Sequence, residues 1–201
     1  MDYIKTNILP DRYYHLFNHA NNKLNLFNQE QDYNNFLKRF QRYIAPISKT
    51  LAYCLMPNHY HFFIKIKSEE KISKLKADNS AEKIIANRLK NFIISYSRYY
   101  QKTHKIKGSI FQQKTKRIEI TEDDYFFHLV GYIHMNPVNH GFVDKPEEWS
   151  YSSYRAFKEN SKSSIVATDY VMNMYGNEEN FDVHHEDLIV KKYAKQMELT
   201  Y

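Results

Sequence analysis

Apolar positions along the first third of the chain change period in a fixed order. Residues 12–20 alternate apolar and polar side chains, as in a β-strand, and residues 29–45 repeat apolar side chains at helical spacing. Two further apolar runs, at 50–56 and 59–67, flank a Pro-Asn corner and are typical of a strand pair. The order predicted for this part is strand, helix, strand, strand.

The pattern continues with a helix, a strand and another helix. Residues 81–105 carry one apolar stripe along a long helix, and residues 109–120 are predicted to form a strand. Thr121 is expected to cap a last helix, which runs from 122 to about 136 and ends at Pro137.

The succession β-α-β-β-α-β, followed by one more helix, predicts an α+β fold of the ferredoxin-like kind. In that arrangement the strands form one antiparallel sheet, the first two helices cover one face, and the other face stays free for a substrate. We expect residues 1–157 to form one domain. Residues 158–201 are expected to form a partly helical tail of unknown role, reached through a linker at 161–164.

The composition permits nucleic-acid binding without establishing it. The chain has 201 residues, with 29 Lys and Arg against 23 Asp and Glu, and a net charge of +6. This excess suits a polyanion such as nucleic acid, although many proteins are mildly basic. The chain also contains 18 Tyr and 13 Phe, and tyrosine can stack on bases and donate to phosphates.

Cys54 is the only cysteine, which excludes an intrachain disulfide and fits a reducing compartment. No run approaches the roughly 18 consecutive apolar residues of a membrane span. The N-terminus lacks a basic stretch followed by an apolar one, the pattern of a signal peptide. We therefore expect a cytoplasmic protein with no membrane partner.

His59 and His61 open the second strand of the hairpin. Side chains two apart on a strand point to the same face, and two neutral imidazoles suit a divalent metal with positions left for substrate oxygens. An accidental pair is the alternative, because two histidines one residue apart are weak evidence alone. Zinc would need another ligand, and Cys54 on the preceding strand is less suited to that role because it lies in a strand interior.

Tyr132 and Asn136 lie four residues apart in the last predicted helix and therefore face the same neighbour. A packed tyrosine, followed by an asparagine that ends the helix, is the ordinary explanation of such a pair. Phe126, Val130 and Ile133 fall on another side of the helix and are expected to enter the core.

Four blocks of the sequence resemble the HUH single-tyrosine transposases, close to the group associated with repetitive extragenic palindromes (REP). The blocks are MPNHYHFFIKI, GSIFQQKTKRIEI, YIHMNPVNHGFV and PEEWSYSSYRAF, and they occur in the family's order with plausible spacing. HUH denotes two histidines around a bulky hydrophobic residue, here His59-Tyr60-His61. The resemblance covers residues from about 12 to 157 and is far more specific than the histidine pair alone.

The resemblance implies a metal-dependent endonuclease and strand-transferase, acting through a covalent 5′-phosphotyrosine, for the domain 1–157. The family's metal-binding histidines fall on His59 and His61, and its nucleophile falls on Tyr132. Its third metal-side residue falls on Asn136, where Gln is commoner. The implied cofactor is Mg²⁺ or Mn²⁺, and the implied partner is single-stranded DNA that contains a hairpin. A homodimer would suit two-ended strand exchange, with the tyrosine helix docked on its own sheet or on a partner's.

Basic residues and histidines around the predicted site are candidates for DNA contacts. Lys114, Lys116 and Arg117 lie on the predicted last strand, and His15 and His19 face the same way as each other on a neighbouring strand. Support of the metal ligands, or no role beyond the strand, are the alternatives for these two histidines. Three basic residues of the long helix either contact DNA or form a solvated face: Arg88, Lys90 and Arg98.

Two rival functions stay open from the sequence. A DNA- or RNA-binding protein on the same fold would leave the site unused, and a metal-dependent hydrolase would use water in place of a tyrosine. Tyr125 is the rival nucleophile, although it lies outside the YIHMN block. No role in the reaction is predicted for several other aromatic and histidine residues. We expect Trp149, Tyr151 and Tyr154 to pack in the fold, and His184 and His185 to be solvated.

Overall fold

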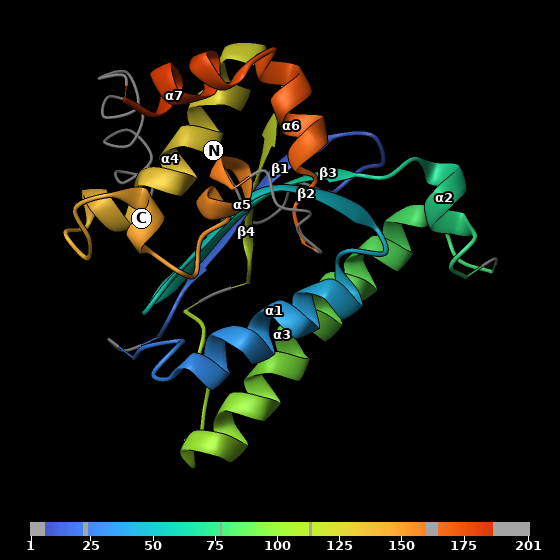
Figure 1. The fold of residues 1–201 in the computed structure, drawn as a ribbon. Helices are drawn as coiled ribbons and strands as arrows, with labels where there is room; N and C mark the ends of the chain where they lie inside the picture. Colours follow the sequence, from blue (N-terminus) through green and yellow to red (C-terminus); the bar gives the residue numbers. More distant parts are fainter. Residues whose placement is uncertain (1–6, 22–23, 77, 113, 160–164, 187–201) are drawn as a thin grey trace.

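A four-stranded antiparallel sheet with helices on both faces makes up the centre of the molecule (Figure 1). The computed structural model describes all residues except 1–6, 22–23, 77, 113, 160–164 and 187–201. The strand order is β2-β3-β1-β4, which confirms the predicted ferredoxin-like arrangement. The strands are β1 (Tyr13–His19), β2 (Ser48–Met56), β3 (His59–Ile66) and β4 (Lys116–Ile120).

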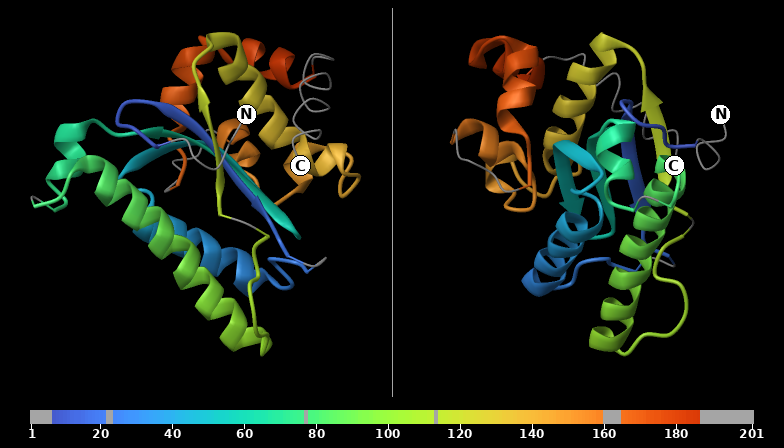
Figure 2. Two further views of the ribbon diagram at one scale, coloured as in Figure 1. Left: turned by 180° about the vertical axis from the view of Figure 1, so that it is seen from behind. Right: turned by 90° about the vertical axis from the view of Figure 1, so that its right-hand side faces the viewer.

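Helices α1 (Glu30–Tyr43) and α3 (Ala81–His104) lie side by side under one face of the sheet (Figure 2). Ser80 caps α3 by accepting a hydrogen bond from the Lys83 amide at 3.4 Å. Phe40 of α1 stacks on Phe62 of β3, with ring centroids 3.9 Å apart. Burying a phenylalanine side chain contributes roughly 1.5–3 kcal/mol, so this packing holds α1 on the sheet, and Phe92 of α3 packs in turn on Phe40 with ring centroids 5.8 Å apart. The short helix α2 (Glu69–Ser73) precedes α3.

The opposite face of the sheet is covered, contrary to the expectation that it stays free. Helix α4 (Asp123–Asn139) crosses β2 and β3 there. Its apolar residues enter the core as predicted, with Phe126 and Ile133 both buried. The expectation failed because α4 is apolar on several sides, so that it needs the sheet as well as its outer neighbours for burial. Those neighbours are η1 (Pro146–Glu148), α5 (Tyr154–Lys158), α6 (Thr168–Tyr175) and α7 (Glu178–Glu186).

Three predicted boundaries are wrong. The last strand comprises only Lys116–Ile120, because the residues just before it include the polar Gln112 and Lys114, both exposed. Glu122, and not Thr121, is the N-cap of α4. Helix α4 also continues through Pro137 to Asn139. Pro137 removes one backbone donor from the last turn, but the following residues still bond to this turn, because the His140 amide donates to the Asn136 carbonyl at 3.1 Å and the Phe142 amide to the Pro137 carbonyl at 2.9 Å.

Among the described residues, no helix combines the length and the apolar character that crossing a bilayer requires. The predicted linker at 161–164 lies outside the described residues. The helices α6 and α7, which follow it in sequence, contact each other, and α7 also contacts α4.

Candidate active site

Histidines from two neighbouring strands gather on the sheet face beneath α4. In the antiparallel register of β1 and β3, Phe17 pairs with His61 and His19 pairs with His59. Because paired residues point to the same face, these side chains line one strip of sheet with His15. Their imidazole rings stack in pairs, His15 on His61 at 5.1 Å and His19 on His59 at 4.8 Å between centroids.

The Pro57–Asn58 corner that precedes His59 is held by backbone hydrogen bonds. The amide of Ala20 donates to the carbonyl of Asn58 at 2.7 Å, and the amide of Leu26 donates to the carbonyl of Pro57 at 2.6 Å. The residues that follow β1 therefore hold this corner in place through backbone hydrogen bonds. As a result, the start of β3 and its first histidine have a fixed position.

Helix α4 brings Tyr132 and Asn136 onto these histidines. The ring of Tyr132 meets the ring of His61 edge-on, with centroids 5.5 Å apart at 85°. One turn later, Asn136 Oδ1 lies 3.0 Å from His59 Nε2. Four helical residues rise about 6 Å, and two strand residues rise about 6.6 Å. The spacing of Tyr132 and Asn136 along the helix therefore nearly equals the spacing of His61 and His59 along the strand, and each helix residue contacts one histidine.

The second ring nitrogen of each HUH histidine also has a partner. His59 Nδ1 lies 2.8 Å from Asn58 Oδ1, and His61 Nδ1 lies 2.9 Å from His15 Nε2. Metal-binding histidines commonly donate the other ring N–H to an oxygen or another acceptor, which fixes the ring and its tautomer. Sequence reasoning missed this role of Asn58, although the residue lies inside the MPNHYH block. For His15, the structure favours support of His61 over a plain strand role.

Burial keeps the clustered histidines neutral near pH 7. Desolvation lowers the pKa of His15 and of His59 to about 3, and that of His19 to about 4. The pKa of His61 falls well below its usual value of 6.5 for the same reason, with further lowering by the histidines around it. Neutral imidazole is the form that binds metals.

The donor atoms of His59 and Asn136 fit a divalent cation. A neutral imidazole carries one N–H, and when it donates from Nδ1 to Asn58 Oδ1, His59 Nε2 presents a lone pair toward the oxygen of Asn136. Two ligands about 2.1 Å from a metal and at right angles to each other lie about 3.0 Å apart. The separation of 3.0 Å between these atoms is compatible with that arrangement and is also the length of an ordinary hydrogen bond.

Beside His59 and His61, the third implied metal ligand is the carboxamide of Asn136. Within the described part of the chain, no three His, Cys, Asp or Glu side chains converge as a metal site. Cys54 pairs with His61 in the β2–β3 register, but its thiol is buried, its pKa is raised by desolvation, and its Sγ contacts Met56 Sδ at 3.7 Å. These properties favour a thiol that packs in the sheet over a thiolate that binds zinc.

The cluster is closed at one end and approaches the surface at the other. Tyr132 is 1% exposed and His61 is fully buried. His19 is only half-buried, and His140, whose ring lies 5.4 Å from that of His59, is exposed. Sequence reasoning missed His140. The residue continues the four-residue spacing of Tyr132 and Asn136, and the end predicted for the helix at Pro137 hid that spacing.

The three basic residues predicted to contact DNA lie at different places relative to the sheet. Lys116 lies on the histidine face of β4, paired with Phe17, and its Nζ is 5.6 Å from the centre of that ring. Arg117 points to the opposite face and lines a hollow beside α3. Lys114 precedes the strand and is exposed. Only Lys116 therefore shares the sheet face of the histidines.

The predicted packing of the aromatic block and the predicted solvation of two tail histidines had different outcomes. The packing role of the aromatic block is confirmed, because Tyr151 stacks on Tyr33 at 3.6 Å and Trp149 Nε1 donates to the Leu55 carbonyl at 3.0 Å. The prediction that His184 and His185 are solvated is wrong. His184 is half-buried, and His185 is buried against α4.

His185 ends a hydrogen-bonded chain that joins α7 to α4. Its Nδ1 donates to the Phe181 carbonyl at 2.7 Å, and its Nε2 lies 2.8 Å from His134 Nδ1. His134 Nε2 in turn lies 2.7 Å from Ser153 Oγ. Burial lowers the pKa of His185 to about 4 and that of His134 well below its usual value, so that the chain is uncharged. His134 lies between Tyr132 and Asn136 in sequence, and its own side chain faces away from the strand histidines.

Known proteins similar to this chain include one that shares its fold. No protein-family model matches the chain. A curated protein of Haemophilus influenzae, described as a REP-associated tyrosine transposase, is 24% identical over 127 residues, which are 61% of this chain and 66% of that protein's length. A solved structure of a REP-associated tyrosine transposase bound to a REP hairpin superposes with a TM-score of 0.60. The chain resembles the REP-associated tyrosine transposases.

The resemblance predicted from the sequence is thus confirmed. The structural match covers 82% of this chain and 90% of the transposase, at 17% sequence identity, and shows that the fold is shared. The chain spans about two thirds of the length of the Haemophilus relative. The roles of individual residues rest on their geometry here.

Proposed function

We propose that this protein is a transposase-like enzyme that cuts and rejoins single-stranded DNA beside a hairpin, with Tyr132 as its nucleophile. The observation that supports the proposal is the pairing of Tyr132 with His61 and of Asn136 with His59 across one helix–strand interface. A core tyrosine alone would need no such partners. The solved transposase with the shared fold is bound to a REP hairpin, and we extend a hairpin partner to this chain.

Each residue has a chemical task in the proposed reaction. Tyr132 Oη attacks phosphorus and gives its proton to solvent or a neighbouring base. The bond from phosphorus to the 3′ oxygen breaks, and that oxygen takes a proton from solvent. The products are a 5′-phosphotyrosine and a free 3′-OH. The phosphotyrosine ester retains the energy of the phosphodiester. A second 3′-OH can therefore displace Tyr132 and form a new DNA phosphodiester.

His59, His61 and Asn136 are the proposed ligands of Mg²⁺ or Mn²⁺. When bound, the cation supplies charge neutralisation at a phosphate oxygen. Asn58 contacts Nδ1 of His59 and His15 contacts Nδ1 of His61, so Nε2 is the proposed cation-binding nitrogen of each imidazole. In the proposed site all of these residues come from one chain.

The burial of Tyr132 implies a local opening before DNA binds. A phosphodiester reaches the phenol only if the C-terminal part of α4 moves from the sheet at its exposed end, where His140 and His19 lie. Lys116, on the same face, is placed to contact the incoming strand. Loop and helix-end motions of this kind commonly precede chemistry in enzymes.

A cleavage assay separates the proposed enzyme from its two rivals. Labelled hairpin oligonucleotides with single-stranded flanks, including the DNA around the protein's own gene, are incubated with Mn²⁺ or with a chelator. We expect cutting that needs the metal and is lost in Tyr132→Phe and in His61→Ala. Cutting by Tyr132→Phe at the wild-type rate would indicate a water-using nuclease. Binding of the gene-flanking hairpins without any cutting would indicate a DNA-binding protein.

A further inference from the structure

A groove runs between α1 and α3 on the side of the molecule away from α4. It consists of two hollows of about 410 and 450 Å³, which adjoin at Tyr43 and Asn91. Helices α1 and α3 lie on the face of the sheet opposite α4 (Figure 2). The helix groove is therefore separate from the histidine cluster beneath α4. The proposed active site uses none of its residues.

The helix groove is lined by positive charge. Arg42, Lys76 and Arg88 line the first hollow, and the second adds three more basic residues. Neither lining contains an acidic residue. Among the described residues, none of the ion pairs involves these cations. The basic residues of the second hollow are Arg39, Arg98 and Lys102.

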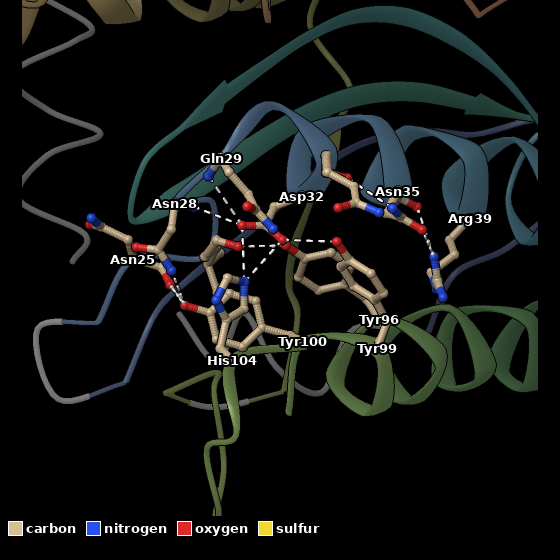
Figure 3. A network of polar contacts seen from close by, with 12 residues as sticks. Asn25, Asn28, Gln29, Asp32, Asn35, Arg39, Tyr96, Tyr99, Tyr100 and His104 are labelled. Carbon is tan, nitrogen blue, oxygen red and sulfur yellow. Dashed lines mark hydrogen bonds and ion pairs between the residues drawn. The ribbon is translucent and has the colours of Figure 1, made fainter. Parts of the chain in front are cut away.

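A polar network fixes the position of one of these cations (Figure 3). Arg39 Nη1 donates to Asn35 Oδ1 at 2.8 Å, and its guanidinium lies 4.8 Å above the ring of Tyr99. The Tyr99 hydroxyl donates to Asp32 Oδ1 at 3.0 Å, which holds the ring in turn. His104 completes this support with a contact of 3.0 Å to the same carboxylate. Arg39 therefore keeps its charge in the groove with neutral partners.

The aromatic rings of the helix groove are not open stacking platforms. Arg39 lies over Tyr99, and the Arg42 guanidinium lies 5.7 Å from the centre of the Tyr43 ring. Single-strand binding uses exposed rings on which bases stack, whereas phosphate contacts need cations and amide donors. The lining offers the second set, because it combines arginine and lysine with Asn87 and Asn91.

The length of the groove also suits a duplex. Its lining follows α3 from Ile84 to Thr103, which is roughly 28 Å at 1.5 Å per residue. One turn of B-DNA is about 34 Å long. The cations can therefore follow the phosphates of most of one turn.

We propose that the helix groove binds the phosphate backbone of duplex DNA, and specifically the stem of the hairpin whose single-stranded flank enters the active site. This inference rests on the proposed function for the identity of the DNA. It answers the question that the sequence left open for Arg88 and Arg98, which contact the stem. Lys90 lines neither hollow and belongs to the solvated face of α3.

The test compares two triple variants that lose the same charge. The first variant removes groove cations, Arg42→Ala, Arg88→Ala and Arg98→Ala. Affinity for a fluorescent hairpin with a 12-base-pair stem and for an unpaired oligonucleotide of equal length is measured by anisotropy across a salt series. Losing three phosphate contacts should weaken hairpin binding at least about tenfold and reduce the salt slope by about 2.7. Unpaired DNA should lose less affinity.

The matched control removes exposed lysines outside the helix groove, Lys38→Ala, Lys90→Ala and Lys107→Ala. It should change hairpin affinity by less than about threefold, because screened distant charges contribute little. Circular dichroism and thermal melting confirm that both variants fold. Three results would each overturn the groove proposal. They are equal losses of hairpin affinity in the two variants, a groove variant that loses more affinity for unpaired DNA than for the hairpin, and wild-type protein that does not bind the hairpin.

This test and the test of the active site can fail independently. Binding is measured without cleavage, so a Tyr132→Phe protein should bind the stem as wild type does. Cleavage that persists while the groove variant binds normally would overturn the groove proposal and leave the proposed enzyme intact. Stem binding that depends on the groove, without any reaction at Tyr132, would retain the groove and exclude the tyrosine chemistry.

Discussion

At the residue scale, His59 is held between two asparagines. Asn58 Oδ1 lies 2.8 Å from its Nδ1, and Asn136 Oδ1 lies 3.0 Å from its Nε2. The first contact fixes the tautomer and ring angle, and the second forms one edge of the proposed metal position. Because a neutral imidazole has a single N–H, removal of Asn58 frees the ring to donate toward Asn136 and to block that position.

We therefore predict that Asn58→Ala weakens Mn²⁺ binding by about 10- to 100-fold, the usual effect of losing the partner of a metal-binding histidine. Calorimetric titration of the protein with Mn²⁺ measures this loss. Asn34→Ala, at an exposed position on α1, is the control and should bind Mn²⁺ as wild type does. Unchanged affinity in Asn58→Ala would mean that the asparagine plays no part in metal binding.

At the element scale, the site depends on how α4 is held. The sheet fixes one side of this helix, and the other side contacts α7 through His134 and His185. Both imidazoles are buried and neutral, and Ser153, which donates to His134 Nε2, ties the chain to β2 by accepting a hydrogen bond from the Tyr53 amide at 2.9 Å. A buried polar chain of this kind stabilises packing only when every member has its partner.

His185→Ala should lower the free energy of unfolding by about 1–3 kcal/mol, because it leaves the ring of His134 without one hydrogen-bond partner. Urea denaturation followed by circular dichroism gives the value. Val183→Ala, two residues earlier on an exposed face of α7, should change stability by less than about 0.5 kcal/mol. If both substitutions had the same small effect, the described packing of α7 on α4 would be wrong.

The order of the elements could be predicted from the sequence, whereas several of their ends could not. Alternation placed His15 and His19 on one face, and helical spacing placed Tyr132 and Asn136 together, because both patterns are local. Pro137 was predicted to stop α4, but a proline in the last turn is tolerated, and the error hid His140. His185 was predicted to be solvated because its neighbours are charged. Its spacing of four from the buried Phe181 was the available signal.

At the scale of the whole molecule, the fold buries several uncharged histidines on both sides of α4. Burial lowers the pKa of His15 to about 3 and that of His185 to about 4, with His61 and His134 lowered as well. In the unfolded chain each histidine titrates near 6.5. Below that pH the unfolded state therefore binds more protons than the folded state, and stability falls with falling pH.

We predict acid unfolding between pH 6.5 and about 4. At pH 5 each histidine that stays neutral in the fold costs about 2 kcal/mol relative to pH 7, and a few such groups approach the total stability of a typical domain. Urea midpoints at pH 7.5, 6 and 5, measured with a chelator present, should fall steadily. A midpoint that stays constant down to pH 5 would show that these histidines are not buried neutral.

The proposed reaction requires that Tyr132 becomes covalently linked to DNA. Intact-protein mass spectrometry after incubation with hairpin oligonucleotides and Mn²⁺ tests it most directly, with wild type beside Tyr132→Phe. We predict that the wild-type protein alone gains the mass of the 3′ portion of the cut strand, and that peptide mapping places the adduct on Tyr132. DNA cut by both proteins with no added mass, or an adduct mapped to Tyr125, would contradict the account.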